Sequence, residues 1–204
     1  MPGFSSNYLP FRAQHIILRC IQRHLETRFF QFIVRWLPSE SIKVGWKCAE
    51  SVELHRVFNF LAKYQGNIQD SRFNLAWKAI QRWRCVITNI RHAAVHRIEQ
   101  GRDTLLRMNH IAIKLVRCIA GFEMSHSLRG LQKVLHKKIS SLDQLNSQLW
   151  RNLDRQLLLC DTCPKDHEKR LKLLPEAANR LQQSHEDKFL AEVSNYIGTE
   201  FDSS

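Results

Sequence analysis

The sequence predicts an all-α fold, and three observations support that prediction. Only seven Gly and five Pro occur among 204 residues, which favours long helices over short strands joined by turns. Apolar residues recur at steps of three and four along most of the chain, the period of one buried helix face. With 44% hydrophobic and 25% charged residues, the composition is that of a globular protein with a sizeable core.

Four helices are expected in the first part of the chain, and we interpret them as a bundle. Residues that start or stop helices bound them. Pro38 follows the first and Gly66 follows the second. Asp70 or Ser71 caps the third, which Gly101 closes, and Asp103 caps the fourth. The expected helices span residues 11–37, 41–64, 72–100 and 103–121.

The pattern changes from Ser125 onward to leucines and isoleucines separated by polar residues. This pattern resembles a coiled-coil-like arm or a helical hairpin, although its steps drift from a strict heptad. The segment Cys160–Pro164 breaks the helix, and a returning helix follows that is interrupted or restarted at Pro175. The apolar positions of the first arm helix are Leu128, Leu131, Leu135, Ile139, Leu142, Leu145, Leu149, Leu153 and Leu157.

These patterns divide the chain into two units and a tail. Residues 1–122 form a basic helical bundle whose first ten residues are expected to be disordered. Residues 123–198 form the hairpin or coiled-coil-like arm. Residues 199–204 are expected to fray.

The net charge of +12 is concentrated in the middle of the chain. Residues 70–140 carry fourteen Lys/Arg and four Asp/Glu, whereas residues 141–204 carry eight and eleven. Such a field attracts polyanions, namely RNA, DNA or an anionic membrane surface. Alternatively, the acidic C-terminal third or a partner protein neutralises it. The residues expected to face a polyanion are Arg82, Arg84, Arg97, Arg102 and Arg107.

One short stretch has the residue types of a catalytic site. Arg91 is followed by the polar residue His92, three apolar residues and then His96. An arginine can hold a phosphate with its planar guanidinium group, and a histidine can transfer a proton near neutral pH. The stretch therefore has the groups that cleavage of a phosphodiester requires.

This spacing is similar to the Arg–polar–x3–His signature of HEPN domains, small all-α bundles that include many metal-independent ribonucleases. The stretch His-Ala-Ala-Val-His-Arg, residues 92–97, also resembles a helix of filamentous-fungal helical proteins. The HEPN resemblance implies that Arg91 holds the scissile phosphate, that His96 is the general acid or base, and that His92 orients the site. In that family the two residues usually converge across a dimer interface.

Helical geometry limits this interpretation. An uninterrupted helix places Arg91 and His96 about 140° apart, so they converge only if the backbone breaks or a second chain contributes. His92 and His96 are four residues apart and share a face. A packing role for the two histidines, or a simple phosphate contact by the stretch, is therefore the alternative to catalysis.

No metal and no cofactor is predicted. His92 and His96 lack the Glu that follows the first His in helical zinc proteases. Cys160, Cys163 and His167 lack a second ligand pair, so we interpret them as a turn between helices. A Gly-rich phosphate loop, a Gly-x-Ser-x-Gly elbow and paired carboxylates are also absent from the sequence, which argues against nucleotide hydrolysis and serine-hydrolase chemistry.

The cysteines and the N-terminal segment bear on the compartment. Six cysteines without a secretory signal favour a reducing, intracellular location, cytoplasmic or nuclear. Residues 1–38 carry five arginines and one acidic residue, Glu26, which suits a mitochondrial presequence as well as an amphipathic core helix. The most apolar run, 105–122, contains three basic residues, so no integral membrane span is expected.

Three functions follow from these observations. The leading one is a non-catalytic basic helical module that binds a polyanion, with RNA as the first choice, or a partner helix. The second is a HEPN-like, metal-independent endoribonuclease. The third is a structural protein that forms a homodimer through residues 123–198.

Overall fold

The computed structural model describes residues 8–161 and 167–201, with side chains described except at 153, 156–161 and 167–175. The described residues contain seven α-helices and no strand, so the all-α prediction is confirmed. The helices are α1 (Phe11–Trp36), α2 (Pro38–Lys43), α3 (Leu54–Tyr64), α4 (Ser71–His96), α5 (Arg102–Ala120), α6 (His126–Asp161) and α7 (His167–Phe201). Short 3-10 turns occur at Ala49–Ser51, Gln65–Asn67 and Glu123–Ser125. None of these described helices combines the length and apolar character that crossing a bilayer requires.

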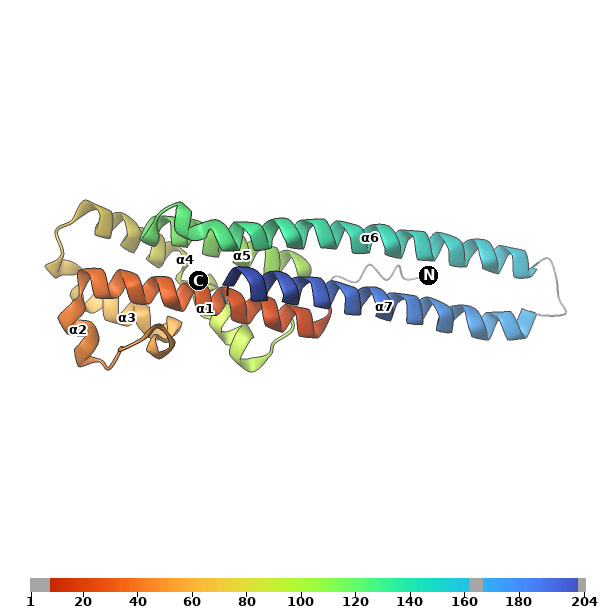
Figure 1. Ribbon diagram of the computed structural model, residues 1–204, viewed down its shortest axis with the longest axis horizontal. Coiled ribbons are helices and arrows are strands. Elements are labelled where there is room, and N and C mark those ends of the chain that lie inside the picture. Colours follow the sequence, from red (N-terminus) through yellow and green to blue (C-terminus); the bar gives the residue numbers. More distant parts are fainter. Residues whose placement is uncertain (1–7, 162–166, 202–204) are drawn as a thin grey trace.

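Most of the other helices pack against α1, whereas α6 packs on α5 and α7. Helix α1 contacts α3, α4, α5 and α7, and it lies alongside the C-terminal half of α7 (Figure 1). Its buried positions cover more than half of its circumference, because apolar residues occur at both three-residue and one-residue steps. They include two polar residues, Gln14 and His24. A helix buried to this extent fixes the positions of the elements that pack against it.

The prediction of one continuous second helix over residues 41–64 is wrong. The chain instead forms α2, an irregular stretch with a 3-10 turn, and α3. Gly45 takes a φ of +82°, which a right-handed helix does not allow, and α2 ends just before it. The buried ring of Trp46 then packs against Phe60 of α3, with ring centroids 4.7 Å apart. This contact folds the stretch back onto α3.

The ends of α4 show one correct prediction and one correction. Asp70 caps the helix as expected, because its carboxylate accepts hydrogen bonds from the backbone N–H groups of Arg72 and Phe73 at 2.7 and 3.2 Å. The helix ends at His96 and not near residue 100. Arg97 adopts the left-handed conformation, with φ +53°, and its N–H bonds to the carbonyl of Ala93.

Gln14 joins the N-terminal segment to the connection between α4 and α5. Its side-chain amide donates to the carbonyl of Leu9 at 2.6 Å, and its side-chain oxygen accepts from the backbone N–H of Gln100 at 2.7 Å. Tyr8 and Gly101 form an isolated antiparallel bridge beside it. The last three of the ten residues predicted to be disordered are therefore ordered, and Leu9 is buried.

Helices α6 and α7 form a long antiparallel hairpin that extends beyond the other helices (Figure 1). The predicted interruption at Pro175 is wrong, since α7 is continuous from His167 to Phe201. Of the tail predicted to fray, residues 199–201 continue α7, and the ring of Phe201 packs against His24 at a centroid distance of 5.6 Å. Residues 202–204 lie outside the described residues.

The two hairpin helices approach closely where Gly130 faces Tyr196. A Cβ atom at Gly130 would lie 2.9 Å from Cζ of the Tyr196 ring and would overlap its hydroxyl. That hydroxyl donates to the carbonyl of Ser127 at 3.1 Å, and burial raises the pKa of Tyr196 to about 12. Lys138 and Glu192 form an ion pair between the same helices.

Hydrogen bonds fix the α5–α6 corner, which we define as residues 121–125. The hydroxyl and the backbone N–H of Ser125 both donate to the carbonyl of Phe122, at 2.7 and 3.1 Å. Nε2 of His24 lies 3.1 Å from the carbonyl oxygen of Met124 and must donate, because a carbonyl only accepts. Burial, and secondarily the charge of Arg28, lowers the pKa of His24 to about 4, so the ring is neutral at neutral pH.

The close approach of α6 and α7 can be tested with Gly130→Ala. The added methyl group overlaps the Tyr196 ring, which is rigid and hydrogen-bonded. The substitution is therefore expected to lower the free energy of unfolding by about 1–3 kcal/mol. Gly198→Ala is the matched control in α7, where nothing lies within 4 Å of the added atom, and it should stabilise the protein. Equal urea midpoints for the two variants would contradict the described packing.

The state of His24 predicts a dependence of stability on pH. The pKa of His24 is lowered from 6.5 to about 4 in the folded protein, so below pH 6.5 the unfolded chain binds a proton that the folded one does not. This residue should therefore remove about 3 kcal/mol of stability as pH falls from 6.5 to 4. In urea unfolding, His24→Gln should have a shallower pH profile than the wild type over this range. His136→Gln removes an exposed imidazole and is the control. Parallel pH profiles for His24→Gln and the wild type would refute the low pKa assigned to His24.

Candidate nucleic-acid interface

The structure separates the members of the Arg91–His96 motif. Because α4 is continuous through His96, Arg91 and His96 leave the helix about 140° apart. Arg91 is partly buried, and its Nη2 lies 3.8 Å from Oε2 of Glu53 at the start of α3. His92 and His96 are both exposed, with ring centroids 4.6 Å apart. Within one chain, therefore, the two histidines meet and the arginine does not join them.

The surroundings of Arg91 are acidic. Burial raises the pKa of Glu26 on α1, while a hydrogen bond from Gln22 and the charge of Arg91 act in the opposite direction. Glu53 also lies within ion-pair distance of His55 and Arg56 in α3. These carboxylates compensate the charge of Arg91 and would repel a phosphate group. The sequence did not indicate this environment, because Glu26 and Glu53 are distant from Arg91 along the chain.

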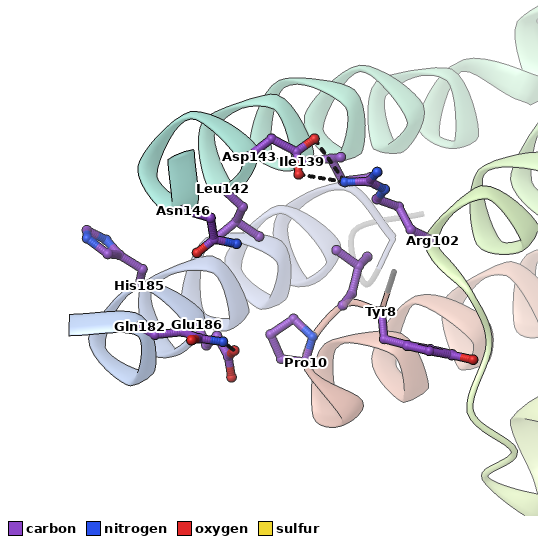
Figure 2. Close-up of a pocket in the computed structure, with 11 residues that line it drawn as sticks. Tyr8, Pro10, Arg102, Ile139, Leu142, Asp143, Asn146, Gln182, His185 and Glu186 are labelled. Atoms are coloured by element: carbon purple, nitrogen blue, oxygen red, sulfur yellow. Dashed lines mark hydrogen bonds and ion pairs between the residues drawn. The ribbon is translucent and has the colours of Figure 1, made fainter. Parts of the chain in front are cut away.

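The five arginines predicted to face a polyanion occupy different environments. The guanidinium of Arg84 lies over the ring of Phe58 at 5.4 Å. Nη1 of Arg102 donates to both carboxylate oxygens of Asp143, at 2.6 and 2.9 Å (Figure 2). The remaining three are exposed: Arg82 in the middle of α4, Arg97 just after its last residue, and Arg107 on α5. The structure therefore does not gather the five into one site.

A pocket beside Arg102 has no excess of positive charge. It lies between the segment Tyr8–Pro10, α6 and α7, and it encloses roughly 430 Å³, including space open to solvent. Figure 2 shows Arg102 turned toward Asp143 at its edge, with Gln182 and Glu186 contributed by α7. Asp143 neutralises Arg102 and Glu186 adds negative charge, so this pocket does not suit a phosphate.

A different set of basic residues lies on the exposed side of α5. Arg107, His110, Lys114 and Arg117 are spaced by three and four residues, and all four are exposed. This spacing places them on one stripe of the helix. The only acidic residue of α5, Asp103, lies in its first turn. The stripe therefore presents positive charge along most of the helix.

Helix α6 contributes a second stripe beside the first. Arg129 and Lys133 begin this stripe, and its further members are His136 and Lys137. Two contacts show that α5 and α6 run antiparallel. Arg102, at the start of α5, pairs with Asp143 far along α6. Arg117, near the end of α5, shares the ring of Phe122 with Arg129 in the first turn of α6.

We call the two stripes together the basic face. Residues 104–142, which span it, contain seven Lys/Arg and a single acidic residue, Glu123. The neighbouring helix α4 packs against α5 and has no acidic residue, and its Lys78 and Arg82 are exposed. Sequence spacing alone could have revealed each stripe. Their juxtaposition depends on how α5 packs against α6. The members of the basic face are Arg107, His110, Lys114, Arg117, Arg129, Lys133, His136 and Lys137.

The described residues contain no group of three or more His, Cys, Asp or Glu side chains arranged to hold a metal ion. The cluster of Cys160, Cys163 and His167 that the sequence singled out lies outside the described side chains. Within the described part of the chain, the basic face is therefore an arrangement whose charge clearly favours anionic ligands.

No protein-family model matches the chain, and no curated protein or solved structure matches it significantly. The resemblance to HEPN domains therefore rests on the residues from Arg91 to His96 and on the all-α fold.

Proposed function

We propose that this protein is a non-catalytic module that binds RNA through the basic face. The observation that supports the proposal is the pair of adjacent cationic stripes on α5 and α6, which have one acidic residue between residues 104 and 142. A nucleic acid presents a regular series of negative charges. Its affinity for such a surface comes chiefly from the counterions released when lysines and arginines replace them.

The arrangement of the charges also supports this proposal over binding at the Arg91 motif. Arg91 has Glu53 beside it, whereas Lys114 and Arg107 are exposed and form no ion pair within the described residues. A ribonuclease built on Arg91 and His96 would need the two residues from different chains. Cleavage in EDTA that disappears in His96→Ala would favour that alternative over simple binding.

We further propose that α6 and α7 serve as an arm attached to a basic helical bundle of about four helices. The distal part of the arm extends beyond the other helices (Figure 1), and among its described side chains Trp150 and Leu181 are 43% and 48% exposed. A second copy of the chain or a partner helix could cover these residues, in the manner of a coiled coil. Sedimentation velocity of the intact chain would detect the dimer, and a monomer at all concentrations would exclude it.

The RNA proposal predicts a specific change in salt dependence. Replacing Arg107 and Lys114 together by Gln removes two cationic contacts. The slope of log affinity against log salt for a single-stranded RNA should then fall by about 1.4 units. The control replaces Lys43 and Lys47 by Gln, which changes the net charge equally at exposed positions on α2 and the following loop. Fluorescence anisotropy across a salt series measures both.

Equal losses in the two double variants would show that only net charge matters and would contradict a defined face. Vesicles containing an anionic lipid provide the competing ligand. If the wild type binds these vesicles but not RNA, and Arg107 and Lys114 account for that binding, the basic face is a membrane-binding surface and the proposal is wrong.

A further inference from the structure

An exposed aromatic ring lies where the two stripes of the basic face meet. Phe122 is 48% exposed, although the large apolar residues of α5, which ends two residues before it, are mostly buried. The guanidinium carbon of Arg117 lies 4.9 Å from its ring centroid, and that of Arg129 lies 4.0 Å away. Two guanidinium groups thus lie within cation–π distance of one exposed ring.

The position of this ring is fixed by the backbone around it. Gly121 ends α5 with a φ of +100°, which favours glycine and turns the chain sharply out of the helix. Ser125 then holds the carbonyl of Phe122 with two hydrogen bonds, and His24 holds the carbonyl of Met124. A ring presented on such a corner loses little conformational entropy when a ligand stacks on it.

The two arginines are available for a ligand. Neither Arg117 nor Arg129 forms an ion pair within the described residues. Nε of Arg129 is buried and lacks a hydrogen-bond partner there, so its guanidinium is held by the ring and not by a carboxylate. Guanidinium planes can stack on nucleobases as well as on aromatic rings, and their N–H groups can donate to phosphate oxygens.

We propose that Phe122, Arg117 and Arg129 form a stacking platform for an unpaired base, so that the ligand of the basic face is single-stranded RNA. The inference rests on the proposed function and adds the class of ligand. In a duplex the bases are already stacked within the helix and cannot reach the platform. An unpaired strand can place one base against the platform formed by these three side chains while Lys114 and Lys133 contact the phosphates on either side.

The test compares three ligands of equal length: single-stranded oligoadenylate, the corresponding duplex RNA, and an abasic strand with the same number of phosphates. Phe122→Leu keeps an apolar side chain but removes the aromatic face. It should weaken binding of the single strand about tenfold while leaving the affinities for the duplex and the abasic strand unchanged. Arg129→Lys keeps the charge but removes the planar group, and it should show the same selectivity. Met124→Leu, at an exposed neighbouring position, should bind all three ligands like the wild type.

Because the three ligands are compared on one protein preparation, loss of folding cannot imitate this result. A base analogue whose fluorescence is quenched by stacking should be quenched by the wild type and not by Phe122→Leu. Equal weakening of all three ligands, or no weakening in either variant, would overturn the platform and leave the salt-dependent binding in place. A wild type that binds none of the ligands would overturn the proposed function as well.

Discussion

The burial of α1 is the constraint on which the rest of the structure depends. More than half of its circumference is buried, including two polar side chains, Gln14 and His24. A buried polar group without a partner costs about 1–3 kcal/mol, so these two side chains must find hydrogen-bond partners. Gln14 finds them at Leu9 and Gln100, and His24 at the carbonyl of Met124. The connections on both sides of α5 are thereby fixed relative to α1.

Fixing both ends of α5 also fixes the distribution of charge. The apolar side of α5 faces the core, which leaves its cationic stripe exposed beside that of α6. Asn109, fully buried, donates to the carbonyl of Leu128 at 3.1 Å and locks the two helices together. Glu123 is the single acidic residue between 104 and 142, whereas acidic residues are more frequent near Arg91 and in the C-terminal third. This separation of charge, and not the Arg91–His96 motif, is the physical basis for assigning an anionic ligand to the α5–α6 surface.

The sequence predicted features that depend on a few neighbouring residues. The all-α class, the cap at Asp70 and the end of α5 at Gly121 are of this kind. It missed the break at Gly45, because a lone glycine inside an apolar pattern does not show which φ it adopts. It also missed the pairing of Arg91 with Glu53 and the arginines around Phe122. Those contacts join different elements and depend on packing, which spacing along one helix does not encode.

The most direct test of the central claim is a titration of isotope-labelled protein with single-stranded RNA, followed by amide chemical shifts. If the basic face binds RNA, the largest shifts will fall on the exposed positions of α5, on the first turns of α6 and on the corner at residues 121–125. Shifts confined to the distal arm, or to the surroundings of Arg91 and Glu53, would contradict the account.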